Sequence, residues 1–356
     1  ETRERILEFW NGLRGALGEH VNIRTRGTNL CTGIDIGSDA SPLEDIYREN
    51  PAVDAPVNSP WAALDADFGL ELSGWMSHIA VRPGETYRFR FYTHDPWWQN
   101  SPWLDRYNRQ PHDLYLPLSV SRLHDDGSAE IPRDLAFLSI DSSLGELPLQ
   151  VPNEVTAYFL KARELAPDQL GPLVWIYPFQ EFHQMGLEAG MPERPLHADS
   201  WVGSLINAGV PLNTVADADI LADGLEAGTA STEGRLFLAP VPRPGSSYEG
   251  LIRKLMDRGA ELLLFGPLFD ESFLWDRLGL VPEEGLSGDL ELENGAHAGQ
   301  SIRHLDCLSA GRWREAPGDS LDPSRAVCAS RDGRRRVAFT VTQGTGSGRI
   351  GWLRAS

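Results

Sequence analysis

Apolar residues recur along this chain with two periods, one helical and one extended. Near the N-terminus, Ile6, Trp10, Leu13 and Leu17 are spaced three or four residues apart, which predicts an amphipathic helix. Residues 87–92 read YRFRFY, and this alternation predicts a strand with two different faces. Helices and strands are therefore mixed from the start of the chain.

The first 198 residues continue as mixed α and β. Further strand candidates are 21–24, 75–81, 114–120, 135–140 and 173–177. The last two are apolar runs typical of strands buried on both faces, and a helical pattern over 153–165 separates them. Strand, helix and strand in this order predict a parallel sheet, whose carboxyl edge is where sites are built.

Residues 201–279 alternate helix and strand at short spacing. Helices are predicted over 201–208, 216–223, 248–258 and 271–278, and strands over 210–215, 236–240 and 261–265. This alternation predicts a flavodoxin-like or Rossmann-like layer. From residue 281 onward the pattern changes to short strands, at 286–292, 301–308, 326–330, 336–342 and 349–353, which indicates part of a sandwich.

Composition excludes several classes of function. The net charge of -19 repels phosphate backbones and anionic lipid, so neither a nucleic acid nor a membrane is an expected partner. No apolar run approaches about 18 residues. The three cysteines are far apart and form no CxxC, which argues against disulfides and structural zinc and favours a reducing, cytoplasmic location.

No cofactor or metal motif is present. The histidines lack the spacing of metal ligands, no GxGxxG follows a strand, and no P-loop occurs. The glycine-rich segment 344–348 joins two strand patterns and is typical of a hairpin turn. We therefore expect neither a metal ion nor a cofactor.

The middle of the chain resembles a known domain. The helix-to-strand passage 205–211, with the strands around 236–240 and 262–267, is similar to the class I glutamine-amidotransferase-like domain, often called the β-galactosidase trimerisation domain, which many glycoside hydrolases carry after a (β/α)8 barrel. This resemblance implies a homo-oligomer formed through 199–280 and a sugar substrate, an oligosaccharide or a glycoside.

The amidotransferase-like part has no catalytic apparatus of its own. Enzymes of that class use a cysteine on a sharp turn after a strand, with a histidine nearby. Residues 201–279 contain neither a cysteine nor a histidine, and Gly266-Pro267-Leu268 occupies the corresponding turn. Covalent amidotransferase chemistry is thus excluded, and a structural or oligomerising role remains.

The resemblance also implies the organisation of the whole α/β chain. Residues 1–198 would be the C-terminal part of a (β/α)8-type barrel, 199–280 the amidotransferase-like domain, and 281–356 a β-rich domain. Five or six strand candidates are too few for a complete barrel, so we expect a longer parent protein.

A tryptophan-rich segment follows the predicted strand at 87–92. Its candidate sugar-binding residues are His94, Trp97, Trp98, Asn100 and Trp103. Aromatic faces stack on sugar rings while polar groups bond the hydroxyls, so the mixture suits a carbohydrate subsite. The alternative is a tryptophan-rich loop that caps the end of a barrel.

Glycosidic hydrolysis needs two carboxyl groups, and four candidates follow predicted strands: Asp95, Asp141, Glu146 and Glu181. Glu181 is surrounded in sequence by aromatic residues, where desolvation raises a carboxyl pKa toward the range of an acid catalyst. Asp141 directly follows an apolar strand. The alternatives are a helix cap at Asp141 and a solvated loop residue at Glu181.

Arg24 and Arg26 alternate on a predicted strand. Two arginines on one face could grip a carboxylate or a sugar acid, or they could neutralise buried carboxylates. The sequence thus predicts an enzyme of glycoside-hydrolase type. The alternative is a non-catalytic carbohydrate-binding or oligomerisation module with a degenerate barrel.

Overall fold

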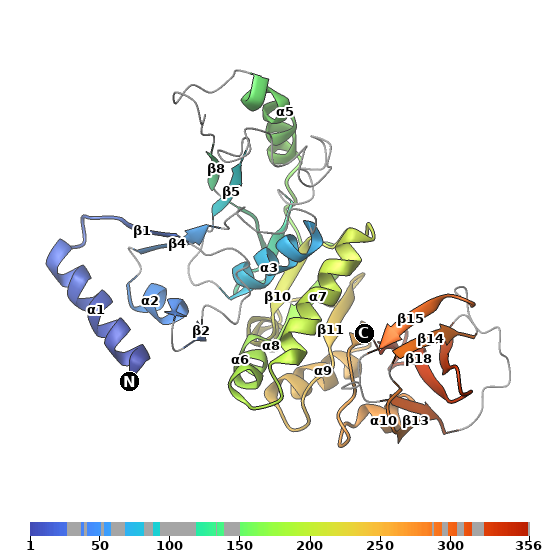
Figure 1. Ribbon diagram of the computed structural model, residues 1–356. Coiled ribbons are helices and arrows are strands. Elements are labelled where there is room, and N and C mark those ends of the chain that lie inside the picture. Colours follow the sequence, from blue (N-terminus) through green and yellow to red (C-terminus); the bar gives the residue numbers. More distant parts are fainter. Residues whose placement is uncertain are drawn as a thin grey trace.

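The computed structural model describes residues 1–26, 37–38, 41–50, 53–57, 68–81, 88–92, 119–132, 134–138, 150–286, 288–293, 298–304, 310–314 and 324–354. The dominant feature is a mixed sheet of 11 strands in the order β15-β14-β17-β18-β19-β12-β11-β9-β10-β6-β7. In Figure 1, α1 and the C-terminal strands lie at opposite ends of the molecule.

The centre of the sheet is parallel. Its strands are β6 (Ser121–Leu123), β9 (Leu173–Tyr177), β10 (Thr214–Asp217), β11 (Leu236–Pro240), β12 (Glu261–Phe265) and β19 (Arg349–Leu353). From β10 onward the spatial order is β10-β9-β11-β12-β19, with every neighbouring pair parallel. In chain order this is 2-1-3-4-5, the strand order of flavodoxin-like sheets.

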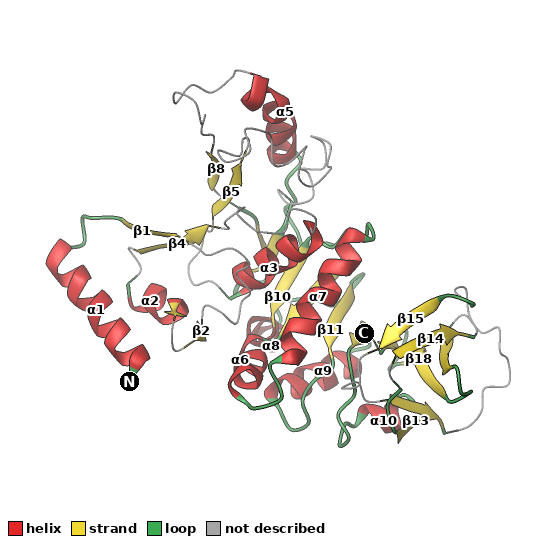
Figure 2. Ribbon diagram, viewed as in Figure 1, coloured by secondary structure: helices red, strands yellow, loops and turns green. Residues whose placement is uncertain are grey.

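Helices cover both faces of this centre, as Figure 2 shows. They are α3 (Phe68–Ala80), α6 (Phe179–Leu187), α7 (Glu193–Asn207), α8 (Ala218–Ala227) and α9 (Ser247–Asp257). Alternate side chains of β9 enter different cores: Trp175 and Tyr177 pack with α3, α6 and α7, whereas Val174 and Ile176 pack with α8 and α9. Two buried faces explain why this strand is apolar throughout.

The strand Leu173–Tyr177 is expected from the sequence in the barrel part that ends at residue 198. In the structure it belongs to the main α/β sheet, paired with β10 on one side and β11 on the other. An apolar run fits either setting, because both bury the strand on two faces. The α/β sheet thus begins before residue 198.

Residues 75–80 of the predicted strand 75–81 form the end of helix α3 instead, and Val81 lies in the turn that follows. The buried residues Leu72, Trp75, Met76 and Ile79 recur at the helical spacing of three and four and face α7. Contact is close where glycine meets glycine: a Cβ on Gly69 would lie 1.9 Å from the carbonyl oxygen of Gly203. The apolar run at 75–81 is short, and the helical spacing becomes evident only when Leu72 is included.

The six C-terminal strands are β13 (Leu280–Glu283), β14 (Gly288–Leu292), β15 (Ser301–His304), β16 (Ala310–Trp313), β17 (Arg325–Ser330) and β18 (Arg335–Gln343), and α10 (Leu274–Arg277) precedes them. Four of them, β14, β15, β17 and β18, continue the main sheet, whereas β13 and β16 pair with each other in a separate two-stranded sheet. Strand β19 pairs parallel with β12 and antiparallel with β18, so the parallel and antiparallel parts share one hydrogen-bonded sheet. The sequence predicts part of a sandwich in this region. In the structure β19 is hydrogen-bonded on both sides, so no free edge separates the antiparallel strands from the parallel ones.

The N-terminal part contributes smaller elements. They are α1 (Thr2–Leu17), β1 (Ile23–Arg26), β2 (Gly37–Ser38), β3 (Ser41–Pro42), α2 (Leu43–Glu49), β4 (Val53–Val57), β5 (Arg88–Tyr92), β7 (Ala129–Glu130), β8 (Asp134–Leu138) and α5 (Gln150–Glu164). Strands β1 and β4 pair in parallel, as do β5 and β8, and β4 contacts β5. The two strands predicted at 135–140 and 173–177 lie in separate sheets, since β8 pairs with β5 and β9 pairs with β10 and β11.

Candidate functional site

The carboxyl edge of the parallel strands holds the candidate site. After β9 the chain crosses to β10 on one side, and after α8 it returns past β9 to β11 on the other side. The ends of β9 and β11 therefore flank the point where the strand order reverses. In open α/β sheets, ligands bind in the crevice at this point.

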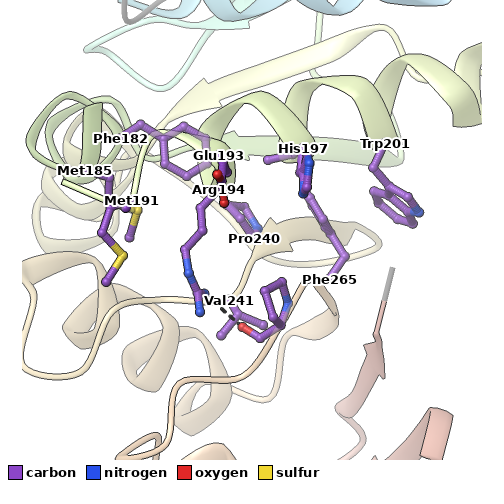
Figure 3. Close-up of a pocket in the computed structure, with 14 residues that line it drawn as sticks. Phe182, Met185, Met191, Glu193, Arg194, His197, Trp201, Pro240, Val241 and Phe265 are labelled. Carbon is purple, nitrogen blue, oxygen red and sulfur yellow. Dashed lines mark hydrogen bonds between the residues drawn. The ribbon is translucent and has the colours of Figure 1, made fainter. Parts of the chain in front are cut away.

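A hollow of about 190 Å³ opens at this edge, between α6–α7 and the ends of β11 and β12. Its walls are mostly apolar and include Phe182, Met185, Met191, Trp201 and Phe265. Figure 3 shows these side chains with Glu193, Arg194 and His197, which α7 supplies. We call this site the α7 hollow.

Two ring contacts shape the α7 hollow. The indole of Trp201 stacks on Phe265, with 4.3 Å between ring centroids and 25° between planes. The guanidinium of Arg194 lies 3.6 Å above the ring of Phe269 and donates a 3.0 Å hydrogen bond to the carbonyl oxygen of Pro267. Arg194 therefore fastens α7 to the turn after β12, at one end of the hollow.

Sequence reasoning missed the α7 hollow, although one signal was present. Arg194, His197 and Trp201 are spaced three and four residues apart, which places them on one face of a helix. The opposite wall comes from β11 and β12, more than 30 residues further along the chain. Only the sheet topology brings the two walls together.

Glu181 lies in the first turn of α6, next to the hollow. Its side chain is buried, with the residue 5% exposed, and Oε1 accepts a 3.0 Å hydrogen bond from the backbone N–H of Arg243. Oε2 is buried and accepts no hydrogen bond from the residues that the structure describes. Desolvation raises the pKa of Glu181 to about 7, against the opposing effects of the Ser246 hydroxyl and the Arg243 amide. The sequence-based prediction that burial raises this pKa is consistent with the structure, while the solvated-loop alternative is not.

A second buried carboxyl, which the sequence did not single out, occupies the same sheet edge. Asp217 ends β10 in register with Tyr177 of β9, and its Oδ1 accepts hydrogen bonds from the N–H groups of Asp219 and Ile220. Desolvation raises the pKa of Asp217 to about 7, and the charges of Asp219 and Glu44 act in the same direction. An aspartate between a strand and a helix is a helix-cap signal. The geometry of Asp217 is that of an N-cap of helix α8.

The turn after β12 holds no nucleophile. Gly266 has φ of +99° and is followed by Pro267. The N–H of Gly266 donates to Leu353, and its carbonyl accepts a 3.0 Å hydrogen bond from Nε1 of Trp352. This turn therefore anchors β19 to the end of β12.

Among the remaining predicted site residues, Arg24 alone lies in the described part of the chain. Arg24 lies in β1, where its backbone is in register with Asp54 of β4. The others lie outside the described residues, as does the 114–118 part of the predicted strand 114–120; they are His94, Asp95, Trp97, Trp98, Asn100, Trp103, Asp141 and Glu146. Glu181 is thus the candidate carboxyl group whose surroundings the structure defines.

Metal clusters and membrane spans are both lacking from the described residues. These residues contain no group of three or more His, Cys, Asp or Glu side chains placed to hold a metal ion. Within the same ranges, no helix is both long enough and apolar enough to cross a membrane.

Sequence comparisons identify no relative: no family model matches the chain, and no curated protein matches it. Structural comparison finds a cold-adapted β-galactosidase from Rahnella sp. R3, with 13% identity and a TM-score of 0.47 over 91% of this chain and 54% of that one. A GH42 β-galactosidase from G. stearothermophilus gives 10% identity and a TM-score of 0.48 over 91% and 53%. This chain therefore spans about half the length of these β-galactosidases.

An exo-β-1,4-mannosidase from Opitutaceae bacterium strain TAV5 superimposes over 99% of this chain and 72% of its own, with 10% identity and a TM-score of 0.48.

Proposed function

We propose that this protein is a carbohydrate-active enzyme of glycoside-hydrolase type, which cleaves a glycosidic bond with a pair of carboxyl groups. The observation that carries the proposal is the state of Glu181. Its pKa of about 7 keeps a large fraction of this carboxyl protonated at neutral pH. A general acid in glycoside hydrolysis needs this state, because it must deliver a proton to the leaving oxygen.

The second carboxyl group of the pair is proposed from the sequence. Asp141 is the first choice, and Glu146 and Asp95 are the others. Retention requires about 5 Å between the two carboxyl groups and inversion requires about 6.5–9.5 Å. Trp97, Trp98 and Trp103 would stack on the sugar, and His94, Asn100 and Arg24 would bond its hydroxyls.

The proposed organisation follows from the same reasoning. Strands β1, β4, β5 and β8 would belong to a (β/α)8-type barrel, and the α/β sheet built on β9 would be an amidotransferase-like layer that joins copies of the chain and contributes Glu181 to the site. The anchoring of β19 by the Gly266 turn supports a structural role, without amidotransferase chemistry, for the turn after β12.

One observation favours the alternative, a carbohydrate-binding or oligomerisation module without turnover. Glu181 is 5% exposed, and one of its two oxygens is already bonded to Arg243. A carboxyl group held in this way can serve to position the turn that carries Arg243. In this alternative the tryptophan-rich segment binds sugar, and no bond is cleaved.

Hydrolysis of aryl glycosides separates the two functions. For the enzyme, Glu181→Gln and Asp141→Asn each lower kcat by about 10²–10⁴-fold, the size of a general acid–base contribution. Glu188→Gln is the matched control, because Glu188 is an exposed carboxyl at the other end of α6. Unchanged turnover in both variants would remove these residues from the mechanism. Calorimetric binding of glycosides without turnover, lost in Trp97→Ala and Trp98→Ala, would establish the binding module.

A further inference from the structure

The α7 hollow combines an aromatic and thioether wall with a short polar rim. Phe182 and Met185 are buried at its base, and Trp201 with Phe265 forms one side. Thioether sulfur and aromatic edges make favourable contacts with aromatic rings. The walls are therefore suited to a planar apolar body.

The volume of the hollow limits the size of its occupant. An engineered cavity of about 150 Å³ with apolar walls binds benzene. At about 190 Å³, the α7 hollow accommodates one six-membered ring with a small substituent.

The polar side chains at the rim of the hollow determine which substituent a bound ring can carry. Glu193 and His197 are four residues apart on one face of α7, and both line the hollow. Arg194 lines it too, but its guanidinium is already bonded to Pro267 and stacked on Phe269. Because a carboxylate stands at the rim and the protein carries a net charge of -19, an anionic ring is disfavoured.

We propose that the α7 hollow is a binding site for a neutral phenol, with the ring among the aromatic and thioether side chains of its walls and the hydroxyl at Glu193 and His197. A hydroxyl both donates and accepts, so it can donate to the Glu193 carboxylate and accept from an imidazole N–H. A hexose fits poorly, since hydroxyl groups around its ring would face apolar walls without partners.

Calorimetric titration of the whole chain with three probes tests the site: 4-methylphenol, toluene and methyl glucoside. We expect saturable binding of 4-methylphenol with a Kd on the order of 1 mM or tighter, which suits so small a ligand. Toluene binds at least tenfold more weakly because it leaves the rim unbonded, and methyl glucoside does not bind in this hollow.

Two variants locate the binding. Ala198→Leu fills the hollow and abolishes binding of 4-methylphenol, whereas Ser200→Leu, on the exposed side of the same helix, leaves it unchanged. His197→Ala leaves the fold intact, since His197 is half-buried at the rim, and removes the preference for 4-methylphenol over toluene. Binding that survives Ala198→Leu, or a preference that survives His197→Ala, would overturn the proposal. So would the absence of saturable binding of 4-methylphenol. None of these results depends on glycoside hydrolysis.

Discussion

The backbone N–H of Arg243 lies 3.0 Å from Oε1 of Glu181 and donates a hydrogen bond to it, across 62 positions in sequence. The guanidinium of the same arginine pairs with Glu188 at 2.6 Å. Arg243 therefore ties the turn between β11 and α9 to both ends of α6. Because one of the two contacts is a buried carboxyl, the strength of this link depends on pH.

Glu181 should make the protein less stable as pH rises. Its pKa is about 7 in the folded protein, against an ordinary value of 4.5, so folding favours the protonated form. The resulting stability is present in full below pH 4.5 and is lost as pH rises through 7. Glu181→Gln keeps the acceptor for Arg243 and removes the ionisation, so it should raise the free energy of unfolding at pH 8 by about 1–3 kcal/mol. Urea unfolding at pH 5 and pH 8 measures this effect.

The control for that experiment is Glu188→Gln, which removes an exposed carboxylate from the same helix. An exposed ion pair contributes about 0–1 kcal/mol, so the difference between pH 5 and pH 8 should stay as in the parent protein. If Glu181→Gln leaves that difference unchanged as well, the carboxyl of Glu181 is ionised without cost in the folded protein.

Asp217 should respond differently to two substitutions. Its Oδ1 caps the N-terminus of α8 through the N–H groups of Asp219 and Ile220. Asp217→Ala loses the cap and should cost about 0.5–2 kcal/mol at pH 5. Asp217→Asn retains an acceptor and should be near neutral at pH 5. Since burial raises the pKa of Asp217 to about 7, the asparagine variant should be more stable than the parent at pH 8. Equal losses in both variants would show that the cap contributes nothing.

The strands of the main sheet were the most predictable part of the fold. Residues 236–240, 261–265 and 349–353 were predicted to the residue, because each is an apolar run bounded by glycine, proline or charged residues. Pairing was less predictable. Nothing local to 173–177 says that this strand lies between β10 and β11, because neighbours in a sheet are chosen by crossovers and by which apolar faces remain to be buried.

The candidate site likewise has a part that could be predicted from the sequence and a part that could not. The burial of Glu181 could be predicted, since it lies among aromatic residues in the sequence, and the structure shows it 5% exposed with desolvation raising its pKa. The α7 hollow could not be, because its two walls come from α7 and from the ends of β11 and β12. Spacing within α7 shows that Arg194, His197 and Trp201 share a face, but it does not show what that face meets.

Glycine substitutions should test the close contact between α3 and α7. A Cβ on Gly203 would lie 2.9 Å from the backbone nitrogen of Leu70, and backbone cannot yield cheaply. Gly203→Ala should therefore cost about 1–3 kcal/mol, as overpacking does. In contrast, Gly250 in α9 has nothing within 4 Å of its Cβ position, so Gly250→Ala should stabilise by about 0.5–1 kcal/mol through helix propensity. Thermal unfolding of both variants measures this opposition. A Gly203→Ala protein as stable as the parent would mean that α3 does not pack on α7 in solution.

The substitution Trp352→Ala tests whether the C-terminal strands unfold together with the parallel sheet. Its indole is fully buried in β19, and Nε1 donates to the carbonyl of Gly266 after β12. Trp352→Ala removes this bond and a large core side chain, at a cost of about 3–5 kcal/mol. Leu236→Ala, at a position 37% exposed in the same sheet, is the control and should cost far less.

Because β19 pairs with both β12 and β18, far-UV circular dichroism and tryptophan fluorescence should give coincident unfolding transitions, and Trp352→Ala should shift both to lower denaturant concentration. Two separate transitions, of which Trp352→Ala moves only one, would instead make residues 281–356 an independent domain.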